Sequence, residues 1–166
     1  MFNKIFIERW QLIMSYLTIF QFEQLRQTIN WDKWPLSPEE WPTELLESSN
    51  CLGFALGIPF ADKGKYTFTP VFLKSFIPQL LSGLGLDYRN ITSDEEANPD
   101  EIIIKCYENL PFNNGFHLIR RNLDGRWVHK EGWYEPPTEI VFNGYFNCMY
   151  PPEAITSIFA VKKRTS

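Results

Sequence analysis

The side chains best suited to nucleophilic chemistry in this 166-residue chain are one of its three cysteines and its two histidines. Cys51 directly follows Ser48-Ser49-Asn50, a helix-start signal, so the sequence predicts a cysteine at the N-terminus of a helix. The partial positive charge and free N–H groups of such a terminus favour a thiolate, which is the nucleophilic form of cysteine. The alternative is a small thiol packed in a core helix.

His117 and His129 flank the sequence Asn-Leu-Asp-Gly at 122–125, which is a strong hairpin signal. With a three-residue loop the two histidines become diagonal neighbours on one face of the hairpin. A loop of two or four residues would put them on opposite faces. If both histidines belong to one site, the loop between the strands must have an odd number of residues, with Gly125 in its left-handed position.

The other two cysteines are expected to be structural. Cys106 lies in an apolar strand pattern, and Cys148 lies in an aromatic stretch that predicts core or a strand end. A zinc site from Cys51, Cys106, Cys148 and a histidine is possible by count, but no CxxC or HxxxH pair supports it. We therefore expect neither a metal nor another cofactor. An odd number of widely spaced cysteines also argues against a disulfide framework and favours a reducing compartment.

Two segments resemble the NlpC-type cysteine peptidases, which belong to the papain-like hydrolases. Residues 50–54 (Asn-Cys-Leu-Gly-Phe) are similar to the nucleophile motif Asp-Cys-Ser-Gly-Phe/Leu of that family. Residues 117–129 are similar to its hairpin, His-Val-Gly-Ile-Tyr-Leu-Gly-Asn-Gly-x-x-Ile-His. Asn50 and Leu52 stand where the family has Asp and Ser. The order is also shared, with the cysteine on a helix followed by two histidines on successive strands.

The resemblance implies a papain-like fold and a catalytic triad of Cys51, His117 and His129. In such a triad His117 takes the proton of Cys51, or holds it as a thiolate–imidazolium pair, and His129 orients His117. The thiolate would attack an amide or ester carbonyl to form a thioester, which water then hydrolyses. Backbone N–H groups at the start of the helix would stabilise the oxyanion.

The region around the second histidine borders the cleft in the family. The resemblance therefore predicts that Trp127 and Trp133 bind substrate, together with Tyr134, although these side chains could instead only close the sheet edge. Glu131 and Asp124 could replace the second histidine in orienting the first, but we expect both to be solvated turn charges.

Three functions remain open on this basis. The first is hydrolysis of an amide bond in a cell-wall (peptidoglycan) peptide or a protein substrate. The second is deamidation or acyl transfer by an effector with the same scaffold. The third is a catalytically inactive binding or immunity protein in which Cys51 is a relic. Hydrogen-bond reach between the Cys51 sulfur and a ring nitrogen of His117 favours the first two, and a Cys51 far from both histidines leaves the third.

The pattern along the chain predicts helices first and mostly antiparallel strands afterwards, which indicates an α+β fold with the N-terminal helices packed on the sheet. Trp31, Trp34 and Trp41 in a Pro-rich loop could line a binding groove, but we expect them to pin that loop to the core. Pro78 is expected to kink or split the helix that contains it. The expected elements are a helix over 3–29, a loop over 30–44, helices over 51–58 and 69–83, an exposed loop over 87–100, and strands over 101–107, 116–121, 126–130, 138–146 and 155–162.

The length predicts a single domain over 1–166. The resemblance implies that this domain is papain-like, with 1–47 as an N-terminal helix and Trp/Pro-rich extension and 48–166 as the catalytic core. Hydrophobic residues make up 44% of the chain, which excludes a disordered protein, and the net charge of −4 argues against a nucleic-acid partner. Glu8 and Arg9 interrupt the apolar N-terminal stretch, so we expect neither a cleavable signal peptide nor a membrane span. The expected location is the cytoplasm, or outside the cell by a route without a cleavable signal.

Overall fold

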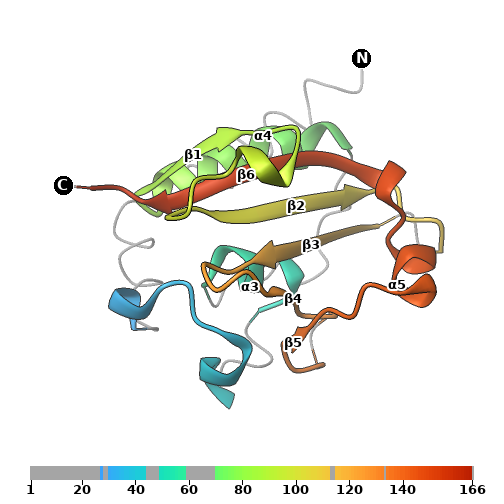
Figure 1. Ribbon diagram of the computed structural model, residues 1–166, viewed down its shortest axis with the longest axis horizontal. Helices are drawn as coiled ribbons and strands as arrows, with labels where there is room; N and C mark the ends of the chain where they lie inside the picture. Colours follow the sequence, from blue (N-terminus) through green and yellow to red (C-terminus); the bar gives the residue numbers. More distant parts are fainter. Residues whose placement is uncertain are drawn as a thin grey trace, which may run out of the picture.

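The computed structural model contains one antiparallel sheet of six strands in the order β1-β6-β2-β3-β4-β5 (Figure 1). It describes residues 27, 30–43, 49–58, 70–112, 115–132 and 134–165, the side chains of 70–72 apart. The strands are β1 Leu86–Asn90, β2 Ile102–Glu108, β3 Phe116–Arg121, β4 Trp127–His129, β5 Thr138–Glu139 and β6 Ile155–Lys163. The helices are α3 Cys51–Leu56, α4 Pro70–Gly83 and α5 Gly144–Met149. The predicted α+β class is therefore confirmed.

Helices cover both faces of the sheet. The larger core joins α3 and α4 to one face, where their apolar side chains meet strand residues such as Ile104, Leu118 and Phe159. A smaller core lies on the opposite face, where Phe146 of α5 and Tyr150 after it pack against Tyr107 and Ile119. Because side chains alternate between the faces of a strand, Leu118 faces α3 whereas its neighbours in β3 face α5.

The helix that carries the predicted nucleophile begins at Cys51, as the sequence predicts. The side chain of Asn50 caps it by accepting the N–H groups of Leu52 and Gly53, at 3.0 and 3.3 Å. The helix ends at Leu56 rather than Ile58, because Gly57 adopts a left-handed conformation with φ of 71°.

The Trp- and Pro-rich segment packs against α3, so the prediction that its tryptophans pin it to the core is confirmed. Trp34 and Trp41 are buried, and Trp31 packs partly buried against the same core. The indole of Trp34 donates to the carbonyl of Leu56 at 2.8 Å. A Cβ at Gly57 would lie 2.4 Å from that indole nitrogen, so the close approach also requires glycine.

Arg120 of β3 connects α3, the hairpin and the Trp-rich segment. Its fully buried guanidinium donates to the carbonyls of Phe54, at 2.8 Å, and Leu36, and to the side-chain oxygen of Asn122 at 2.7 Å. It also lies over the ring of Phe54, 4.6 Å from the centroid. Burial lowers the pKa of Arg120 to about 9, so it remains charged at neutral pH. One buried cation therefore holds three segments together.

The prediction of an exposed loop over 87–100 is wrong at its start. Residues 86–90 form β1, which pairs with β6 along its length. β1 is an edge strand, and all of its side chains after Leu86 are at least partly exposed. The polar, solvent-facing side chains of β1 are typical of a loop, but the backbone of β1 forms a strand because it pairs with β6.

The predicted strand over 138–146 is also wrong, because only Thr138–Glu139 is extended and α5 begins at Gly144. The side chain of Asn143 accepts the N–H of Phe146 at 2.9 Å and caps this helix. The helix directs Phe146 into the smaller core, and that packing overrides the β-propensity of the stretch.

Helix α4 is continuous through Pro78, so the expectation of a split is wrong. Phe76 and Ile77 before the proline and Leu80 and Leu81 after it are all buried in the larger core. Burial of both halves offsets the lost backbone hydrogen bond.

Several predictions lie outside the described residues. They include the helix over 3–29, apart from residue 27, which is helical, and the start signals at Ser48 and Thr69. Across the described ranges, no helix is long and apolar enough to cross a membrane.

Arg120→Met should lower the free energy of unfolding by about 3 kcal/mol or more, because three buried acceptors lose a charged donor. Arg120→Lys should restore only part of this loss, since an ammonium group lacks the planar fork that reaches all three. Denaturant unfolding of both variants tests this, with Arg121→Met on the other face of β3 as the matched control. Wild-type stability in Arg120→Met would show that the guanidinium does not hold these segments.

Candidate active site

The β3–β4 hairpin has the three-residue loop that places both histidines on one face of the sheet. Arg121 pairs with Trp127, and the N–H of Asn122 donates to the carbonyl of Arg126 at 2.9 Å. Gly125 has a φ of 86°, as such a loop demands. The predicted odd loop length is therefore confirmed.

The two histidines consequently lie on one face of the hairpin and form a hydrogen bond. Nε2 of His117 lies 3.0 Å from Nδ1 of His129, and the ring planes are nearly perpendicular, at 82°. Both side chains are buried, on the face of the sheet that α5 covers. This bond leaves Nδ1 as the only ring nitrogen of His117 that can act on another group.

The paired part of the β3–β4 hairpin ends at Arg120–Val128, before it reaches the histidines. The backbone N–H of Leu118, next to His117 in β3, lowers the pKa of the Cys51 thiol. Cys51, the first residue of α3, therefore lies close to the backbone of β3 at Leu118.

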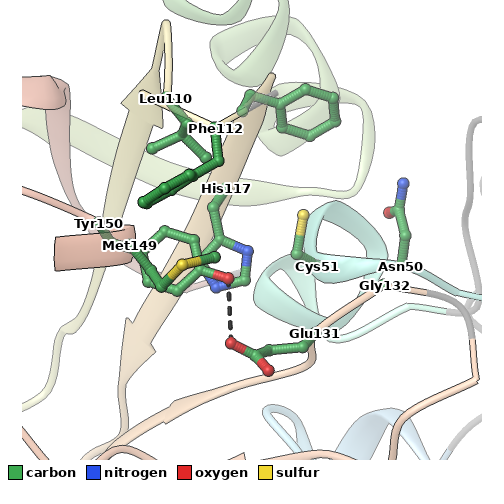
Figure 2. A pocket seen from close by; sticks show the side chains of 10 residues that line it. Asn50, Cys51, Leu110, Phe112, His117, Glu131, Gly132, Met149 and Tyr150 are labelled. Carbon is green, nitrogen blue, oxygen red and sulfur yellow. Dashed lines mark hydrogen bonds between the residues drawn. The ribbon is translucent and has the colours of Figure 1, made fainter. Parts of the chain in front are cut away.

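Cys51 and His117 line one pocket of about 240 Å³. Figure 2 shows the sulfur and the imidazole on the same pocket, with a ring nitrogen on the side of the sulfur. No hydrogen bond joins the two side chains in this resting arrangement, in which His117 bonds His129. Since Nε2 is bonded to His129, the nitrogen nearer Cys51 is Nδ1. The residues around this pocket are Asn50, Cys51, Leu110, Phe112, Phe116, His117, Glu131, Gly132, Met149 and Tyr150.

Burial keeps the thiol and the imidazole neutral. It raises the pKa of Cys51 to about 11, against backbone N–H groups that lower it. Burial, together with the neighbouring His129, lowers the pKa of His117 to about 3. At neutral pH the proton therefore stays on the sulfur, and His117 is a free base beside it. The electrostatics favour general-base action over a preformed thiolate–imidazolium pair.

Tyr150, which follows α5, is a site residue that the sequence analysis did not find. Its ring stacks on His117, with centroids 4.2 Å apart and planes at 18°. Its hydroxyl donates to Glu131 at 3.0 Å, the bond drawn in Figure 2. The helical pattern of 143–150, with an Asn cap, was the available signal, but a predicted strand there obscured it.

Asp124 and Glu131, the two carboxylates considered for orienting His117, lie in different parts of the structure. Asp124 lies in the hairpin turn, where it accepts the N–H and Nε of Arg126, so the expectation of a turn charge is confirmed. Glu131 is exposed, but it lines the pocket and bonds Tyr150. The expectation that Glu131 is only a solvated turn charge is therefore wrong.

Trp127 is not among the residues that line the pocket. Its half-buried ring contacts Phe142 edge-on at 6.1 Å, and the ammonium of Lys105 lies 4.5 Å from its centroid. Trp133 lies outside the described residues, and Tyr134 is 74% exposed. The structure thus does not bring Trp127 to Cys51.

The three cysteines do not gather in one place. Cys106 is buried in the larger core, as predicted. Cys148 is exposed on α5, so the expectation of a core or strand-end position is wrong, because the expected strand is a helix. In the part of the chain that the structure describes, no three His, Cys, Asp or Glu side chains are placed to hold a metal ion.

The arrangement can move a proton from a thiol to an imidazole while the sulfur attacks an electrophile in the pocket. No protein-family model matches this chain, and no curated protein or solved structure shows significant similarity to it. The function is therefore inferred from the site itself.

Acidification from pH 6 to pH 5 should destabilise the protein. The pKa of His117 is about 3 in the folded protein against 6.5 ordinarily, so the unfolded chain binds one more proton in this range. The free energy of unfolding should then fall by about 1 kcal/mol per pH unit through this residue. Urea unfolding at several pH values measures the slope, and His117→Asn should flatten it. An unchanged slope in that variant would contradict a buried neutral imidazole.

Proposed function

We propose that this protein is a papain-like cysteine hydrolase that cleaves an amide bond through Cys51, His117 and His129. The observation that carries the proposal is that Cys51 and His117 line the same pocket, while Nε2 of His117 is hydrogen-bonded to His129. The papain-like assignment is supported by a cysteine at the start of a helix that packs on an antiparallel sheet, with the histidine near the start of a strand.

The hydrogen bond between the histidines is compatible with the tautomers that this chemistry needs. For Nδ1 of His117 to accept a proton from Cys51, the ring must carry its own proton on Nε2. In that tautomer Nε2–H of His117 donates to Nδ1 of His129, and the proton of His129 is on its own Nε2. His129 thereby orients His117 and stabilises the positive charge that forms on it during attack.

The reaction then proceeds in two stages. As a substrate carbonyl enters the pocket, Nδ1 of His117 takes the thiol proton and the sulfur of Cys51 attacks the carbonyl carbon. The N–H of Cys51, at the start of α3, is the backbone donor that we assign to the oxyanion. His117 returns the proton to the leaving amine, and a thioester remains. Water, deprotonated by His117, hydrolyses the thioester and frees the thiol.

The substrate class that the motif resemblance implies is a cell-wall peptide or another peptide. Leu110, Phe112 and Met149 give the pocket an apolar wall, and Glu131 and Asn50 supply polar groups. Mixed lining of this kind suits a peptide segment, in which apolar side chains alternate with amide groups.

A catalytically inactive binding protein is the second candidate. It is favoured by the burial of Cys51, whose side chain is only 6% exposed, and by its raised pKa. A relic cysteine would have the same burial, but His117 would then have no effect on its reactivity.

Alkylation of Cys51 by iodoacetamide separates these candidates. The Cys148→Ser background removes the exposed thiol, and mass spectrometry follows the peptide that contains Cys51. The rate should rise with pH up to about pH 11, and at pH 7 His117→Asn should slow it by about tenfold, because a general base is lost.

His129→Gln should slow the same reaction by a smaller factor, since it removes only the partner of the base. Asn90→Ala, at an exposed position of the edge strand β1, serves as the control and should leave the rate unchanged, because β6 and β2 separate β1 from the histidine strand β3. A rate in His117→Asn within twofold of the parent would refute the hydrolase and favour the inactive binding protein.

A further inference from the structure

We propose that Tyr150 is a positioning residue that holds the imidazole of His117 in the plane from which Nδ1 faces Cys51. This inference deepens the proposed function and rests on it. The Nε2 bond to His129 anchors the ring of His117 at one atom, but the ring can still rotate about that anchor. An aromatic ring stacked on the imidazole would prevent this rotation. The ring of Tyr150 lies nearly parallel to that of His117, with centroids 4.2 Å apart.

Tyr150 is itself held from several directions. Its hydroxyl donates to Glu131 at 3.0 Å, and burial together with that carboxylate raises the pKa of Tyr150, so the hydroxyl stays protonated as a donor. Its ring contacts Phe146 at 5.0 Å and Tyr107 at 6.0 Å. The backbone N–H of Tyr150 bonds the carbonyl of Phe146 at 2.8 Å, which ties it to α5.

Tyr150 also joins two segments that border the pocket. Glu131 lies two residues after the end of β4, whereas Tyr150 directly follows α5. Their hydrogen bond connects the chain after the histidine hairpin to the helix on the same face of the sheet. Displacement of α5 would therefore shift both the pocket wall and the plane of His117.

The stack and the hydrogen bond predict different effects for two variants. Tyr150→Phe retains the stacked ring and loses only the bond to Glu131, so the orientation of His117 should persist. Tyr150→Leu loses the flat contact, and His117 should then populate both tautomers. Tyr145→Leu is the matched control, because it makes the same change at a position of α5 that is 73% exposed.

The ring ¹⁵N chemical shifts of His117 report its tautomer without reference to catalysis. We expect a single Nε2–H tautomer in the parent, in Tyr150→Phe and in the control Tyr145→Leu, and a mixture in Tyr150→Leu. A single Nε2–H tautomer in Tyr150→Leu would overturn the positioning role, even if Cys51 proves to be a reactive nucleophile.

Alkylation of Cys51 supplies the second test. Tyr150→Leu should slow it by about tenfold at pH 7, Tyr150→Phe by less than threefold, and Tyr150→Leu should add nothing in a His117→Asn background. An equal slowing by Tyr150→Leu with and without His117 would overturn the positioning role. If His117→Asn alone has no effect, the proposed hydrolase fails, and the ¹⁵N shifts still decide the role of Tyr150.

Discussion

The buried guanidinium of Arg120 is the interaction on which the candidate site depends. It bonds the last turn of α3 through Phe54, the Trp-rich segment through Leu36, and the hairpin through Asn122. A charge removed from water needs partners for its donors, so these three acceptors are held in one geometry. The helix that begins with Cys51 is thereby fixed on the strand that contains His117.

Two local features turn this scaffold into a site. The three-residue loop sets the register that brings the histidines together, and the start of α3 brings Cys51 to the pocket that His117 lines. Burial there raises the pKa of the thiol and lowers that of the imidazole. The same low-dielectric surroundings that keep the resting pair neutral also strengthen any charge stabilisation when a substrate arrives.

Most of the sheet could be predicted from the sequence, because β2, β3 and β6 are apolar or β-branched runs with turn signals between them. The two wrong secondary-structure predictions, for β1 and for the stretch over 138–146, share one cause. β1 has the composition of a loop, and the stretch that includes α5 has the composition of a strand, and in both places long-range contacts decide the conformation. The same error hid Tyr150, since its position depends on the helix before it.

Features that depend on near neighbours along the chain could be predicted from the residues alone. The Asn50 cap places Cys51 at the first position of a helix, and the Gly125 turn places His117 and His129 on one face, through contacts only a few residues apart. Three features became visible only in the fold: the packing of α3 on β3, the stacking of Tyr150 on His117, and the protonation states of Cys51 and His117. These depend on burial and on packing between distant segments, and no local pattern encodes either.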